Sequence, residues 1–165
     1  ATSNWRRSPN WLYSVAFVDD GLDRLQVEFD ASPAAAPIDT TRQLFGALDA
    51  EFADRPEVWR PIFSMLKSGP GVHGMGAVGD RVVAIIEADL DKAAADGAFV
   101  GDVDTVRLAR HVFATRMNRL EKWALGVIDW EAYVESSTLG LELVLASALA
   151  EPARTDALRR SGVLR

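Results

Sequence analysis

Apolar residues recur at steps of three and four along nearly the whole chain, which is the period of an amphipathic α-helix. The first such run follows Ser8-Pro9, a pair that suits the cap and first turn of a helix, and it continues to Phe29. No alternation of apolar and polar positions lasts long enough to build a sheet. The pattern predicts an all-α protein, a helical bundle of about six to seven helices.

Capping residues and glycines mark where further helices begin and end. Asp39, Asp104 and Asp129 each precede an apolar run, so each is expected to cap the helix that follows. Gly126 is expected to end the second-last long helix, and a last short helix is expected from about residue 155. These signals divide the chain after Asp39 into helices joined by short turns.

Two segments are expected to interrupt the helices. Pro61 lies inside an apolar run that starts at Pro56, and proline removes one amide hydrogen bond, so we expect a kink or a break there. The stretch 68–79 holds five glycines. It is therefore expected to be irregular, with the next helix beginning at about Asp80.

The last two long helices carry more apolar surface than one domain covers. The helix expected over 104–125 has two apolar faces, and between residues 130 and 149 the only charges are Glu131, Glu135 and Glu142, near one line. The simplest further cover is a second copy of the chain, so we expect these two helices to form a four-helix-bundle dimer interface. The alternative is that the last helix is the buried centre of a monomer. The residues expected at the interface are Thr115, Arg119, Trp123, Tyr133, Ser137, Gly140, Leu141 and Val144.

Charge supports this pairing and excludes several chemistries. Residues 104–127 carry five cations and two acids, a net +3, whereas residues 128–150 carry four acids and no base, a net −4. Opposite signs would complement each other in a bundle made by two subunits.

The whole chain has 18 Lys and Arg against 24 Asp and Glu, a net charge of −6, which argues against nucleic-acid binding by this chain. With no cysteine, it has no disulfide, thiolate nucleophile or cysteine-ligated metal.

Three stretches resemble one family. They are Phe52–Arg60 (FADRPEVWR), the segment from Gly97 into a helix that ends Trp123-Ala124-Leu125-Gly126, and the helix over 129–149. Together they are similar to the C-terminal ligand-binding and dimerisation domain of the TetR (tetracycline-repressor) family of bacterial transcriptional regulators. The resemblance covers about residues 10–150.

The resemblance implies an N-terminal stub (1–9), a ligand-binding and dimerisation domain (10–150) and a C-terminal tail (151–165). Members of the family carry an N-terminal helix-turn-helix domain, of which residues 5–11 are at best a degenerate remnant. The implied partners are a second copy of the chain and a small-molecule effector, with DNA bound only through the missing domain. We expect a cytoplasmic protein with no cofactor, metal or membrane span, and we expect that it is not an enzyme.

In this family, effectors enter a mostly apolar pocket between the middle helices of each subunit. Aromatic rings and methionine suit such an adaptable cavity, although the same residues also suit plain core packing. Arg116 and Asn118 could add polar selectivity. The expected lining residues are Phe17, Phe45, Leu48, Trp59, Phe63, Met65, Val82, Ile86, Phe113 and Met117.

Other chemistry has weaker support. His73 and His111 lack the spacing of a metal site, so no metal is expected. Residues 69–74 match the pattern G-x-G-x-x-G, but no strand precedes them, so no nucleotide fold is expected. The alternative functions are a helical protein-interaction module without a small ligand and, less favoured, an unrecognised enzyme, for which no catalytic constellation stands out.

Overall fold

The computed structural model describes residues 20–24, 27, 38–65 and 72–165. In this part of the chain every regular element is a helix, apart from an isolated antiparallel bridge between Phe99 and Leu149. The all-α bundle predicted from the hydrophobic pattern is therefore confirmed. Residues 20–24 are helical, and the longer helices are α2 (Asp39–Asp54), α3 (Pro56–Met65), α4 (Val72–Ala95), α5 (Thr105–Ala124), α6 (Trp130–Ala148) and α7 (Ala153–Arg160).

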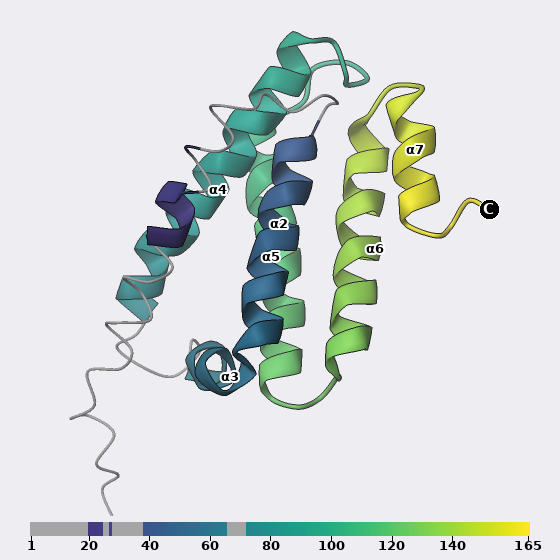
Figure 1. Cartoon of the computed structure of the whole chain (residues 1–165). Helices are drawn as coiled ribbons and strands as arrows, with labels where there is room; N and C mark the ends of the chain where they lie inside the picture. Colours follow the sequence, from purple (N-terminus) through teal and green to yellow (C-terminus); the bar gives the residue numbers. More distant parts are fainter. Residues whose placement is uncertain (1–19, 25–26, 28–37, 66–71) are drawn as a thin grey trace, which may run out of the picture.

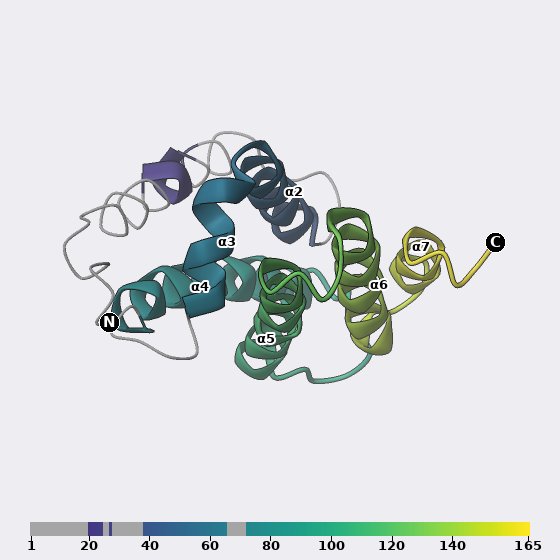
Figure 2. The same cartoon turned by 90° about the horizontal axis from the view of Figure 1, so that it is seen from below.

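Helix α5 lies at the centre of the bundle and contacts α3, α4 and α6 (Figure 1). Helices α5 and α6 run antiparallel, and α7 packs against α6 on the side away from α5. Figure 2 shows α2 on one side of the α5–α6 pair, whereas no described helix covers the other side. None of the described helices combines the length and the apolar character needed to cross a bilayer.

Several predicted helix ends are confirmed at atomic detail. The Asp104 carboxylate accepts a hydrogen bond from the Arg107 amide at 2.9 Å, and that of Asp129 accepts one from the Ala132 amide at 2.8 Å. Gly126 follows α5 with a φ of 72°, the left-handed conformation that glycine adopts without a steric penalty. The α5–α6 turn is thus specified locally by residues on either side of it.

The start of α2 is stabilised by α4 rather than by Asp39, which lies inside the first turn. Ile38 occupies the cap position and offers no side-chain hydrogen bond. Instead the Asp89 carboxylate accepts from both the amide and the hydroxyl group of Thr41, each at 2.8 Å. Both side chains are buried, so this tertiary cap fixes the start of α2 against the C-terminal third of α4.

No break occurs at Pro61, and residues 72–79 of the glycine-rich stretch are helical, whereas residues 68–71 lie outside the described ranges. Helix α3 continues through Pro61, because the carbonyl that loses its partner belongs to Glu57 on the exposed side, while Trp59 and Phe63 hold the other side in the core. Helix α4 begins at Val72, eight residues before the predicted start. The low helix propensity of glycine does not end the helix here, and Gly79 packs against Phe113 of α5.

The charge pattern predicts that Glu142 lies on a solvent-exposed line of α6 together with the other two glutamates. The structure contradicts this, because Glu142 is only 2% exposed. Arg42 of α2 donates two hydrogen bonds to its carboxylate, at 2.8 and 3.0 Å, and Arg160 of α7 donates a third at 3.2 Å. A buried carboxylate needs such partners to offset its desolvation. These contacts tie α2, α6 and α7 together.

The tertiary cap of α2 is testable by mutation. Replacing Asp89 with Ala leaves the amide and hydroxyl group of Thr41 buried without an acceptor, so we expect the free energy of unfolding to fall by about 2–3 kcal/mol. Urea denaturation followed by circular dichroism measures this loss. The control is Asp80→Ala at an exposed position of α4, which should change it by less than about 0.5 kcal/mol. Equal losses in the two variants would contradict the cap.

Candidate ligand-binding site

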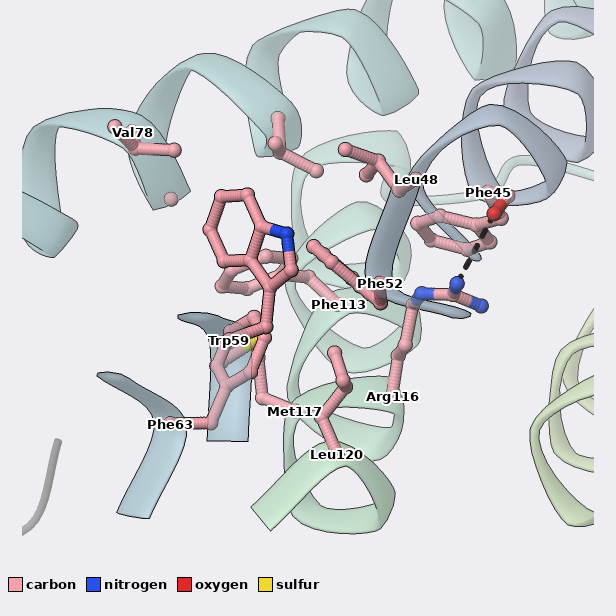
Figure 3. Close-up of a pocket in the computed structure, with 12 residues that line it drawn as sticks. Phe45, Leu48, Phe52, Trp59, Phe63, Val78, Phe113, Arg116, Met117 and Leu120 are labelled. Atoms are coloured by element: carbon pink, nitrogen blue, oxygen red, sulfur yellow. Dashed lines mark hydrogen bonds between the residues drawn. The ribbon is translucent and has the colours of Figure 1, made fainter. Parts of the chain in front are cut away.

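A cavity lies between α2, α3, α4 and α5 (Figure 3). It encloses about 460 Å³ of space that no atom fills, including the part at its mouth that is open to solvent. Arg116 is its one charged lining residue, and the others are apolar residues and a glycine. The lining consists of Phe45, Leu48, Phe52, Trp59, Phe63, Val78, Gly79, Val82, Phe113, Arg116, Met117 and Leu120.

One wall is an aromatic cluster at the corner between α2 and α3. The ring centroids of Phe52 and Trp59 lie 5.1 Å apart and those of Phe52 and Phe63 lie 5.0 Å apart, both edge to face. The indole nitrogen of Trp59 donates a hydrogen bond to the Glu51 carboxylate at 3.2 Å. Because these contacts fix both the rings and the one polar atom among them, the wall is rigid and presents apolar surface to the cavity.

The facing wall comes from α4 and α5 at helical spacing. Phe113, Met117 and Leu120 follow each other on one face of α5, and Val78 and Val82 do so on α4. Gly79 lets the two helices approach closely, since a Cβ atom at this position would lie 3.2 Å from the Phe113 ring. Methionine is unbranched and flexible, so Met117 can adapt to what the cavity holds.

Seven of the ten residues predicted to contact a ligand line this cavity: Phe45, Leu48, Trp59, Phe63, Val82, Phe113 and Met117. Ile86 is fully buried in the core but does not line the cavity. Phe17 and the side chain of Met65 lie outside the part that the structure describes. Contact of any of them with a ligand remains a prediction.

The prediction missed five lining residues, which are Phe52, Val78, Gly79, Arg116 and Leu120. Helical spacing could have identified two of them, because Phe52 and Leu120 each lie seven residues after a predicted lining residue. Arg116 was considered only as a source of polar selectivity, together with Asn118. The structure places Arg116 in the cavity wall and leaves Asn118 exposed.

Arg116 is 7% exposed and reaches from α5 to α2. Its Nη2 donates to the Phe45 carbonyl oxygen at 3.1 Å and to the carboxylate of Asp49. The centre of the guanidinium group lies 4.1 Å from the centroid of the Phe45 ring and 5.7 Å from that of Tyr133, where a cation is attracted by the ring electrons. The positive charge therefore has a counter-ion and two aromatic faces.

Asp49 also joins α6 to this cluster, because the Tyr133 hydroxyl group donates to its carboxylate at 2.8 Å. Burial raises the pKa of Asp49 above the ordinary value of 3.8, even though Arg116 and the Tyr133 hydrogen bond lower it. Burial also raises the pKa of Tyr133, so that its hydroxyl group keeps its proton and remains a donor. Asp49 of α2 is thus a half-buried acid bound by side chains of α5 and α6.

The residues predicted at a dimer interface occupy two kinds of position. Trp123, Tyr133 and Ser137 are buried within the single chain and have little surface left for a second copy. The remaining five, Thr115, Arg119, Gly140, Leu141 and Val144, are half-buried. A Cβ atom at Gly140 would lie 3.3 Å from Cγ2 of Thr115, so part of this predicted face joins α5 to α6.

No group of three or more metal-ligating side chains lies together within the described ranges. His111 is exposed on α5. Residues 69–71 of the glycine motif lie outside the described ranges, and residues 72–74 belong to α4. A strand before a helix, which a nucleotide-binding glycine motif requires, is not found among the described residues.

The raised pKa of Asp49 predicts a specific pH dependence. The folded protein takes up a proton at this group at a higher pH than the unfolded chain does, so its ionisation costs stability at neutral pH. That cost is removed as the pH falls through the folded pKa towards the unfolded value. We expect the free energy of unfolding of the wild type, relative to that of Asp49→Asn, to rise between pH 7 and about pH 4. Urea titrations of both proteins at each pH measure this difference in the free energy of unfolding. If the difference falls as the pH is lowered, the ion pair with Arg116 outweighs the effect of burial.

The chain matches no family model, and no curated protein or solved structure matches it. The resemblance to TetR-family regulators therefore remains a prediction from the sequence. The function has to be argued from the cavity and from the surfaces around it.

Proposed function

We propose that this chain is the effector-binding and dimerisation domain of a TetR-like bacterial transcriptional regulator, and that it senses a small, largely apolar or aromatic molecule. The observation that carries this proposal is the cavity between α2, α3, α4 and α5, whose lining is apolar except for Arg116. Small-molecule sites in proteins are typically apolar hollows with a few placed polar groups, and they occur between the helices of bundles.

The character of the cavity wall favours a ligand over incomplete packing. Its apolar side chains face space that no protein atom fills. Empty apolar space costs stability, because the atoms around it lose their packing partners. A rigid aromatic wall that keeps this space open is therefore better explained by an occupant.

The residues that resemble the TetR family support the same assignment. The stretch Phe52–Arg60 forms the corner between α2 and α3, and its Phe52 and Trp59 belong to the aromatic wall. The segment that carries the resemblance thus contributes directly to the cavity. In the family, such a site biases the first helix of the domain, which positions the DNA-binding part.

A physical route for this coupling is present in the described residues. Val78 and Val82 of the cavity lie on α4, and between them Arg81 forms an ion pair with Asp23 of the helical stretch 20–24. A ligand that binds two arrangements of α4 with unequal affinity would shift the population between them. A movement of α4 would then be passed to the helical stretch 20–24 through this ion pair.

The uncovered side of the α5–α6 pair is the surface that we propose for dimerisation. The exposed residues of the pair include cations on α5, among them Arg107 and Arg110, and acids on α6, Glu131 and Glu135. In a two-fold dimer α5 of one subunit can face α6 of the other, so that these charges complement each other. Leu143 of α6, 40% exposed, adds apolar surface to this side.

A protein-interaction module without a small ligand is the second candidate. Leu125 and Val127, in the turn between α5 and α6, are 57% and 68% exposed. Exposed large apolar side chains next to each other favour contact with another protein. Ligand binding in the cavity separates the two candidates.

The effector proposal predicts ligand-dependent stabilisation. A panel of apolar and aromatic small molecules should contain compounds that raise the melting temperature, since binding to the native state stabilises it by mass action. Replacing Leu48 with Trp fills the cavity and should abolish this shift, whereas the same change at exposed Leu125 should preserve it. Differential scanning fluorimetry measures both. If no compound stabilises the wild type, the interaction module becomes the better account.

The dimer proposal predicts a molecular mass of twice that of the chain at micromolar concentration. Ala114 is exposed on the uncovered side of α5, so Ala114→Glu should place two like charges in the interface and produce monomers without unfolding the chain. The matched control is Ala84→Glu on an exposed position of α4, which should stay dimeric. Light scattering coupled to size-exclusion chromatography measures the mass. A monomeric wild type would refute this part of the proposal.

A further inference from the structure

One nitrogen of Arg116 has no partner among the described residues. Its Nη2 donates to two oxygen atoms of α2, but its Nε is buried and makes no hydrogen bond. Buried donors without an acceptor are rare in folded proteins, because leaving one unpaired forfeits the hydrogen bond that it made to water. The Nε group is therefore expected to meet an acceptor that the described residues do not supply.

The cavity is where that acceptor can come from. Arg116 is the one charged residue of the lining, and it stands on the same helix as Phe113, Met117 and Leu120. Figure 3 shows its side chain at the edge of the apolar lining, with the guanidinium group turned towards Phe45. An acceptor at Nε would thus lie at one end of an otherwise apolar site.

We infer that the ligand is amphiphilic, with an apolar body among the aromatic side chains and one carboxylate that accepts a hydrogen bond from Arg116 Nε. This inference rests on the proposed function and names the class of effector. A carboxylate is favoured over a neutral oxygen because hydrogen bonds between a guanidinium group and a carboxylate are about twice as strong as neutral ones. It is also favoured because guanidinium geometry matches carboxylates.

Asp49 does not prevent this binding, although it already neutralises Arg116. A second carboxylate would place two negative charges on one guanidinium group, which favours a proton on one of the acids. Asp49 is suited to take it, because the Tyr133 hydroxyl group and Arg116 remain as its hydrogen-bonding neighbours. The site can thus accept an anion without keeping an excess negative charge.

Three matched probes test the headgroup: 2-naphthoate, its neutral amide 2-naphthamide, and 2-methylnaphthalene, which has no acceptor. Fluorescence titration gives their dissociation constants. We expect the wild type to bind 2-naphthoate about tenfold or more tightly than 2-methylnaphthalene, with 2-naphthamide between them. This comparison uses the wild-type protein alone and does not depend on the folding of a variant.

The variant Arg116→Lys tests the donor. A lysine keeps the positive charge beside Asp49 but has no donor at the position of Nε. The affinity for 2-naphthoate should fall about tenfold, whereas that for 2-methylnaphthalene should change by less than about twofold. Arg154→Lys, at an exposed position of α7, is the matched control and should leave both affinities unchanged. Circular dichroism checks that each variant folds.

The possible outcomes separate this inference from the proposed function. If 2-methylnaphthalene binds the wild type as tightly as 2-naphthoate, the carboxylate inference is overturned while the apolar ligand site stands. If 2-naphthamide equals 2-naphthoate, the headgroup is a neutral acceptor and the inference is likewise overturned. If none of the three binds, both the inference and the effector proposal fail.

Discussion

The buried guanidinium group of Arg116 constrains the arrangement of three helices at once. It extends from α5, it is paired with Asp49 and the Phe45 carbonyl oxygen of α2, and Tyr133 of α6 completes the cluster. Removing a charge from water is expensive, and the cost is offset only when its partners are held in place. A shift of α2 by one turn would leave the charge uncompensated, so the cluster fixes how α2 sits on α5 and α6. The ion pairs of Arg42, Glu142 and Arg160 do the same further along α2 and α6, and they add α7.

The cavity is a consequence of this arrangement. With α2 fixed on α5, the remaining space towards α3 and α4 is bounded by aromatic rings that pack against each other rather than across the gap. Arg116 belongs to both features, since Nη2 holds the bundle together while Nε is left without a partner beside the cavity. A ligand that engages this residue would act on the same charge that orients α2, α5 and α6. Binding and helix arrangement would then be linked through one side chain.

Much of the fold could be predicted because its signals are local. Capping carboxylates and a left-handed glycine set the ends of α5 and α6, and helical spacing identified most of the apolar cavity wall. The errors concern contacts between distant parts of the chain. Arg116 pairs with Asp49, which lies 67 residues away in the sequence, and Glu142 pairs with Arg42, 100 residues away. Asp89 accepts hydrogen bonds from Thr41, 48 residues away. A charged residue in a sequence is normally expected at the surface, and nothing in the local pattern shows that a partner will arrive from another helix.

Nuclear magnetic resonance of the methionine methyl groups tests the occupied cavity most directly. The chain has three methionines, and Met117 is the one whose side chain the structure describes; it lines the cavity, so labelling with ¹³C-methyl methionine places a reporter inside the proposed site. On addition of 2-naphthoate, the account predicts nuclear Overhauser contacts between the naphthalene protons and the Met117 methyl group. Saturable binding of 2-naphthoate without any such contact, or with the Met117 signal unmoved, would contradict it.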